Sequence, residues 1–181
     1  MEALAYTGSK FLGSRFKGFN RAANLKALVT GAGGFLGLYL VEMLLARGDR
    51  VRAISRQRYP QLDRAGVEAI QGDLRDAQTA ADACRGIDVV YHAAGVAGIW
   101  GPWVHYYRIN TLATHNVVAG CLQHRVPKLV YTSSPSVTFD GGDQQGVDES
   151  VPYPQRWLCH YPHTKALAEQ QVLNANGRDG L

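Results

Sequence analysis

Cysteine is scarce in this sequence and its spacing is irregular. The three residues Cys84, Cys121 and Cys159 lie far apart among 181 residues, and no Cys-x-x-Cys pair occurs. An odd number of widely spaced cysteines does not make a disulfide framework or a thiol-redox motif. We therefore expect reduced, partly buried thiols and a cytoplasmic protein.

Long apolar runs and a basic face are also lacking. The stretch 89–107 has no Asp, Glu, Lys or Arg, but its glycines and Pro102 exclude an integral membrane span. The first 24 residues hold four basic side chains against Glu2, a local sum of +3 that leaves +1 of the net charge of +4 for the rest. This balance argues against a nucleic-acid partner. With no apolar run before a cleavage-like site, residues 1–24 are expected to be a basic, loosely ordered leader rather than a secretory signal.

Short β-rich segments alternate with helical patterns from residue 25 onward. The strand candidates cover 26–30, 50–55, 67–72, 88–94 and 128–134, and helical spacing covers 35–47, 77–84 and 103–124. A further helix begins near Tyr161, after a long Gly- and Pro-rich loop over 135–158, and loops of this length are usually functional. The alternation predicts an α/β fold, a doubly wound parallel sheet of the Rossmann type, formed by one domain over 25–181.

A glycine-rich turn joins the first predicted strand to the first helix. The sequence "VTGAGGFLG" holds Gly31, Gly33, Gly34 and Gly37, with Phe35 and Leu36 before the last glycine. Glycines at such a junction permit a tight turn and bring a pyrophosphate close to the backbone and to the helix N-terminus. Inside a βαβ pattern this turn predicts dinucleotide binding.

The end of the second predicted strand bears on cofactor choice. An acidic side chain there would accept hydrogen bonds from the ribose of NAD, but Ser55, Arg56 and Arg58 occupy the region and no acid precedes Asp63. NADP is therefore favoured and NAD remains possible. The alternative is that both arginines are merely solvated.

Tyr161 and Lys165 are four residues apart, which places them on one helix face. A cation beside a phenol stabilises the phenolate and lowers the pKa, so that Tyr161 could act as a general acid or base. By chance alone, such a pair is more often a half-buried Tyr with a solvated Lys. His160 and His163 flank Tyr161, but no carboxylate or Cys at ligand spacing completes a metal site.

Seven motifs in order give the chain a family resemblance. They are "VTGAGGFLG", "GDLRD", "VYHAAG", "AGIWG", "NTLATHNVV", "LVYTSSPSV" and "YPHTKALAEQQVL", and they span residue 26 to the end. The chain resembles the extended short-chain dehydrogenases/reductases, in particular the 3β-hydroxysteroid dehydrogenase/isomerase-like branch with its 2-alkyl-3-oxoalkanoate reductases.

The resemblance implies roles by motif position. Ser134 would hydrogen-bond the substrate carbonyl, Tyr161 would donate and accept the proton, and Lys165 would bind the nicotinamide ribose. Further cofactor contacts are implied at Asp73, Leu74, Ala93, Ala94, Gly95, Asn110 and Tyr161. Ala113 stands where the family usually has Gly, three residues after Asn110.

The implied activity is hydride transfer between NAD(P) and a hydroxyl or ketone of a small hydrophobic substrate, sterol-like or long-chain 3-oxoacyl. A homodimer is possible. The resemblance also implies that the C-terminal substrate lobe is missing, so that the chain alone should bind cofactor weakly and turn over little.

Two other functions stay open. A nucleotide-sugar epimerase or dehydratase uses the same three residues, although "VTFDG" at 137–141 departs from the Val-Tyr-Gly common in those enzymes. A non-catalytic NADP-binding sensor would not need them. Ile99, Trp100 and Trp103 form either an apolar substrate wall or a hydrophobic staple at the start of a helix.

Overall fold

A computed structural model describes residues 24–181, so the expected leader lies outside the described residues except for Asn24. The strands are β1 (Lys26–Thr30), β2 (Arg50–Ser55), β3 (Glu68–Gln71), β4 (Val89–His92) and β5 (Leu129–Tyr131). The α-helices are α1 (Phe35–Arg47), α2 (Pro60–Arg64), α3 (Ala77–Cys84), α4 (Trp103–Tyr106), α5 (Ala113–Gln123) and α6 (His160–Ala175). A π-helical segment η1 (Tyr107–Leu112) joins α4 to α5, and a 3-10 helix η2 (Pro135–Thr138) follows β5.

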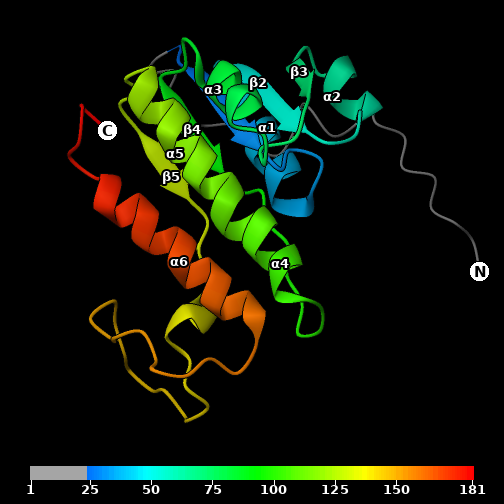
Figure 1. Ribbon diagram of the computed structural model, residues 1–181. Coiled ribbons are helices and arrows are strands. Elements are labelled where there is room, and N and C mark those ends of the chain that lie inside the picture. The colour runs from blue at the N-terminus through cyan, green and yellow to red at the C-terminus, as the bar shows by residue number, and fades with distance from the viewer. Residues whose placement is uncertain (1–23) are drawn as a thin grey trace, which may run out of the picture.

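The five strands form one parallel sheet in the order β3-β2-β1-β4-β5. The chain winds outward from β1 to β3 and then returns to the other side of β1 with β4 (Figure 1). This order reverses between β1 and β4, which is the switch point where ligands bind in such sheets, at the carboxyl ends of the strands. The predicted doubly wound Rossmann sheet is confirmed.

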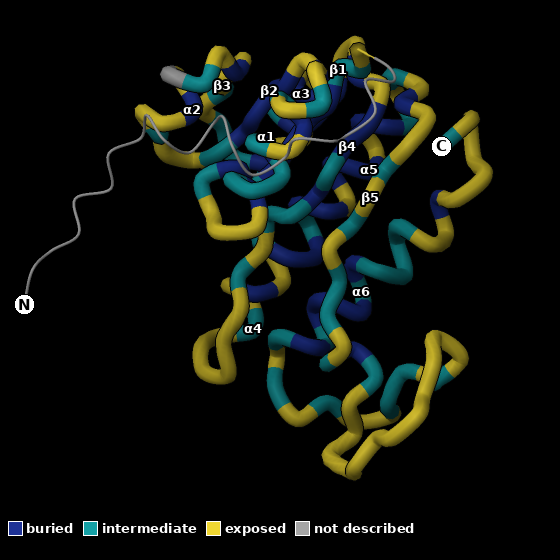
Figure 2. Tube along the Cα trace, turned by 180° about the vertical axis from the view of Figure 1, so that it is seen from behind, coloured by how far each residue is buried: buried dark blue, intermediate teal, exposed yellow. Residues whose placement is uncertain are grey.

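Two hydrophobic cores lie on opposite faces of the sheet. Leu28 of β1 and Val90 of β4 pack with α3 and α5, whereas Ala27 and Val29 pack with α1 and α2. Neighbouring strand residues point to opposite faces, so a sheet covered on both sides needs continuous apolar strands. Figure 2 shows the buried residues concentrated along the central strands and their helices.

The predicted helices over 35–47 and 77–84 have the observed bounds of α1 and α3. The predicted helix over 103–124 is a run of α4, η1 and α5, with a π-helical segment in the middle. Sequence patterns gave no sign of α2, and β5 ends at Tyr131, three residues before the predicted end. Pro135 begins η2 and lacks the backbone N–H that a continued strand would use.

The long loop leads from η2 to α6, and in Figure 1 it lies below the N-terminal end of that helix, away from the sheet. Helix α6 runs beside α5 and packs on α5, η1 and η2. Within residues 24–181, none of the helices combines the length and apolar character needed to cross a membrane.

Candidate dinucleotide and catalytic site

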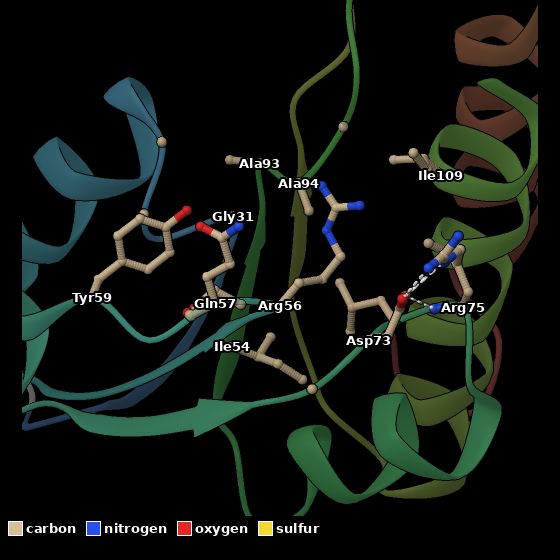
Figure 3. A pocket seen from close by; sticks show the side chains of 17 residues that line it. Gly31, Ile54, Arg56, Gln57, Tyr59, Asp73, Arg75, Ala93, Ala94 and Ile109 are labelled. Carbon is tan, nitrogen blue, oxygen red and sulfur yellow. Dashed lines mark hydrogen bonds and ion pairs between the residues drawn. The ribbon is translucent and has the colours of Figure 1, made fainter. Parts of the chain in front are cut away.

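A cavity of about 310 Å³ opens at the carboxyl ends of β1, β2 and β4. It lies at the switch point of the sheet, between the glycine-rich turn and the segment that follows β4 (Figure 3). Its lining includes Gly31, Gly33, Gly34, Ser55, Arg56, Asp73, Leu74, Ala93, Ala94 and Gly95, all of which the sequence predicts as cofactor contacts.

The glycine-rich turn requires glycine at two positions for different reasons. Gly31 has φ of +67°, and a Cβ there would lie 2.9 Å from the backbone of Ala94. At Gly37 a Cβ would meet the carbonyl oxygen of Gly31 at 2.2 Å. The backbone of β1, the turn and the segment after β4 therefore approach closely. This leaves a cradle before the N-terminus of α1 that is bare backbone at Gly31 and Gly37, with the Tyr59 ring against Gly33, and such a turn fits a pyrophosphate.

Arg56 and Arg75 line the other end of the cavity, and Arg58 does not. Arg58 pairs with Asp63 at 2.9 Å and Arg75 pairs with Asp73 at 2.5 Å. The hydrogen bonds from Arg75 lower the pKa of the Asp73 carboxyl, which stays ionised. Arg56 extends into the cavity near Ala94 (Figure 3), and no carboxylate among the described residues forms an ion pair with it. The charge of Arg56 makes a smaller contribution to the lowered pKa of Asp73, so among the described residues this guanidinium lies near a carboxylate without forming an ion pair.

Some predicted cofactor residues do not line this cavity. Phe35 is 83% exposed and Leu36 is also exposed, while Gly37 is buried under the turn. Conversely, Gln57, Tyr59 and Arg75 line the cavity and sequence reasoning missed them. Gln57 and Tyr59 follow the end of β2, and Arg75 stands in the motif "GDLRD" after β3, which were the signals available.

Asn110 is buried in η1, and its side chain forms hydrogen bonds both to the segment after β4 and to α6. Its side-chain oxygen accepts from the N–H of Val96 at 2.8 Å, and its amide donates to the carbonyl of Val96 at 3.0 Å. The same amide donates to the hydroxyl of Thr164 at 3.2 Å. Asn110 therefore ties the segment after β4 to α6 and does not line the cavity.

Lys165 is buried at the carboxyl end of β5. Its side chain is on α6, its ammonium donates to the carbonyl of Thr132 at 2.5 Å, and it lies 4.1 Å from the ring centre of Tyr131. The residue is 6% exposed, and burial lowers its pKa to about 8. A solvated surface lysine, the alternative that the sequence left open, does not describe this side chain.

Ser134 and Tyr161 lie on the two segments that Lys165 connects. Ser134 follows Thr132 and caps η2, where its hydroxyl is 2.7 Å from that of Ser136. Tyr161 is half-buried in the first turn of α6, one turn before Lys165. The structure thus brings the carboxyl end of β5 and the first turns of α6 together. Ser134, Tyr161 and Lys165 do not line the 310 Å³ cavity.

Aromatic side chains join the loop to α6. Trp103 contacts His160 and His163, and Trp157 stacks on His163 with ring centres 5.0 Å apart. Trp103 therefore packs α4 against α6, whereas Trp100 is 90% exposed. Across residues 24–181, no three His, Cys, Asp or Glu side chains cluster in a way that could hold a metal ion.

The fold is that of the Rossmann-type α/β proteins, and the cavity lies at the switch point where such sheets bind ligands. The sequence profile of the 3-beta hydroxysteroid dehydrogenase/isomerase family matches residues 28–180, and the chain belongs to this family.

Two relatives illustrate the similarity. The chain is 46% identical over 150 residues to the 2-alkyl-3-oxoalkanoate reductase of Shewanella oneidensis, a match that covers 83% of this chain and 39% of that protein. It is 38% identical over 168 residues to the 3 beta-hydroxysteroid dehydrogenase/Delta 5→4-isomerase of Mycobacterium tuberculosis, covering 86% of this chain and 44% of that protein. The chain thus spans less than half the length of these relatives.

Solved structures show the same fold. MoeE5 in complex with UDP-glucose and NAD matches with a TM-score of 0.71 and 35% identity, over 84% of this chain and 50% of MoeE5. A UDP-galactose 4-epimerase matches with a TM-score of 0.73 and 28% identity, over 83% of this chain and 51% of the epimerase.

Proposed function

We propose that this protein is an NAD(P)-dependent oxidoreductase that acts on a hydroxyl or ketone of a hydrophobic substrate. The observation that carries the proposal is the glycine cradle at the switch point, with buried Lys165 and neighbouring Ser134 and Tyr161 on the adjoining segments. The relatives named as an oxoalkanoate reductase and a hydroxysteroid dehydrogenase support the same chemistry.

A bound nicotinamide would supply or accept the hydride at the substrate carbon. Its pyrophosphate would lie at the glycine turn, with Ala94 and Gly95 beside it. Reduction of a ketone builds negative charge on its oxygen, where donors lower the barrier. The Ser134 hydroxyl can donate there when Ser136 donates to it, and Tyr161 can supply the proton. Lys165 would bind the nicotinamide ribose.

The proposed cofactor is NADP. Support comes from Arg56, which extends into the cavity without a carboxylate partner, while Arg58 and Arg75 are each held by an Asp. A guanidinium in this position would pair with a 2′-phosphate through two parallel hydrogen bonds.

The test is NADPH oxidation by a 2-alkyl-3-oxo acid and by a steroid ketone. Tyr161→Phe should abolish oxidation and leave the dissociation constant of NADPH within about twofold, because only the proton donor is lost. Tyr153→Phe is the matched control, since that hydroxyl bonds Glu169. Full turnover by Tyr161→Phe would contradict the proposal.

A nucleotide-sugar epimerase or dehydratase is the second candidate. It is supported by the likeness to MoeE5, whose structure holds UDP-glucose and NAD. Calorimetric titration with UDP-glucose in the presence of NAD tests this candidate, because saturable binding would favour the sugar enzyme over the reductase.

A further inference from the structure

A row of three polar side chains crosses the carboxyl ends of β1, β4 and β5. Thr30 pairs in register with His92, and His92 pairs in register with Tyr131. His92 is 1% exposed, and its ring centre lies 5.7 Å from that of Tyr131. This fully buried imidazole has no part in the chemistry proposed above.

The hydrogen bonds around His92 have a fixed direction. The hydroxyl of Thr114 donates to the carbonyl of Asn110 at 2.6 Å, so it accepts from Nε2 of His92 at 2.9 Å. A neutral ring with its proton on Nε2 has no proton on Nδ1. Nδ1 therefore accepts a hydrogen bond from the Thr30 hydroxyl at 2.7 Å. Thr30 in turn accepts from the N–H of Ala94 at 3.1 Å. Every polar atom in this chain of bonds has a partner.

The surroundings of His92 keep the ring neutral. It faces Thr30 of β1, Thr114 of α5 and Tyr131 of β5, and the Lys165 ammonium of α6 lies over the Tyr131 ring. Burial, with a smaller effect of the Lys165 charge, lowers the pKa of His92 to about 3. The tautomer is therefore constant at ordinary pH.

The two ends of the chain of bonds reach different parts of the site. Ala94 lines the cavity and lies against Gly31 of the turn. Asn110 bonds Thr164, the neighbour of Lys165 on α6. We propose that His92 is a positioning residue whose neutral Nε2–H ring aligns the cofactor-lining segment after β4 with the helix that carries Tyr161 and Lys165. This inference rests on the proposed function.

The tautomer can be tested without any ligand. In a ¹⁵N-labelled sample of the full chain, two-bond ¹H–¹⁵N correlation spectra should show His92 with a protonated Nε2 and a bare Nδ1, unchanged from pH 5 to 8. A proton on Nδ1, or a titration in this range, would overturn the proposal. Assignment uses the disappearance of the signal in His92→Gln.

Binding of two ligands tests the positioning role. His92→Leu should weaken NADPH binding about tenfold and 2′,5′-ADP binding less, because both ligands meet the segment after β4 but only the nicotinamide half of NADPH extends toward α6. His92→Gln keeps an amide that can donate to Thr114 and should recover part of the loss. Val90→Ala removes buried methyls from the same face of β4 and should change neither ligand.

Equal weakening of both ligands, or unchanged NADPH binding in His92→Leu, would contradict the role of His92. Failure of the unmodified protein to bind either ligand would instead contradict the proposed function. If His92→Leu does not fold, His92→Gln and the spectra of the unmodified protein decide the question.

Discussion

Lys165 shows at the scale of one residue how a functional charge opposes stability. Its pKa is lowered from 10.5 to about 8, mainly by burial. Below pH 8 the folded and unfolded chains both carry the charge, and the folded chain bears the desolvation penalty. Between pH 8 and 10.5 the unfolded chain binds one proton more, so the free energy of unfolding rises with pH across this window.

We expect Lys165→Met to be more stable than the unmodified protein at pH 7, by about 1–3 kcal/mol, because one pKa unit corresponds to about 1.4 kcal/mol. The difference should shrink between pH 8 and 10.5. Urea unfolding at pH 7 and pH 10 measures it, with exposed Lys128→Met as control. A Lys165→Met variant less stable at pH 7 would show that the bond to Thr132 outweighs the desolvation.

The role of Arg56 in the choice between NADP and NAD can be tested with Arg58, two positions later, as the control. Arg56→Gln should weaken NADPH binding about tenfold and leave NADH within about twofold, because only NADPH carries a 2′-phosphate. Arg58→Gln should change neither, since Arg58 bonds Asp63 and does not line the cavity. Fluorescence titration gives both constants. A parallel loss of NADH affinity in Arg56→Gln would assign the residue to a phosphate common to both cofactors.

Among the secondary-structure elements, the glycine-rich turn contains one glycine that close packing requires and another that alanine could replace. A Cβ at Gly37 would lie 2.2 Å from the carbonyl oxygen of Gly31, whereas one at Gly34 would approach the same atom only to 3.3 Å. Gly37→Ala should therefore cost about 1–3 kcal/mol of unfolding free energy, and Gly34→Ala less than about 1 kcal/mol. Urea unfolding of both variants measures this. A larger loss in Gly34→Ala would refute the packing argument.

Local patterns predicted α1, α3 and the glycine turn because their signals lie within a few neighbouring residues. The network at His92 gave no such signal. Its ring bonds Thr30 and Thr114, which are 62 and 22 positions away, and each residue alone is ordinary for its strand or helix. The π-helical segment that places Asn110 is also set by packing on α6 rather than by propensity. Side-chain contacts between residues far apart in the sequence could therefore not be predicted from local patterns.

At the scale of the whole molecule, the prediction of one domain over 25–181 can be tested because two kinds of probe report on different parts. Cys84 and Cys121 are fully buried in the core beneath α3 and α5. The three tryptophans, Trp100, Trp103 and Trp157, lie near α4 and the loop before α6. If the chain folds as one unit, both sets of probes must follow a single transition.

We expect the urea midpoint from tryptophan fluorescence to coincide with that from pulse labelling of the two core thiols in Cys159→Ser. That variant removes the partly exposed thiol, which would react without unfolding. Lys165, Asn110 and the His92 network all tie α6 to the sheet side of the molecule, so loss of the core should release the loop end at the same urea concentration. Midpoints more than about 0.5 M apart would mean that α4, the loop and α6 unfold separately, and that the catalytic segments are not locked to the cofactor cradle.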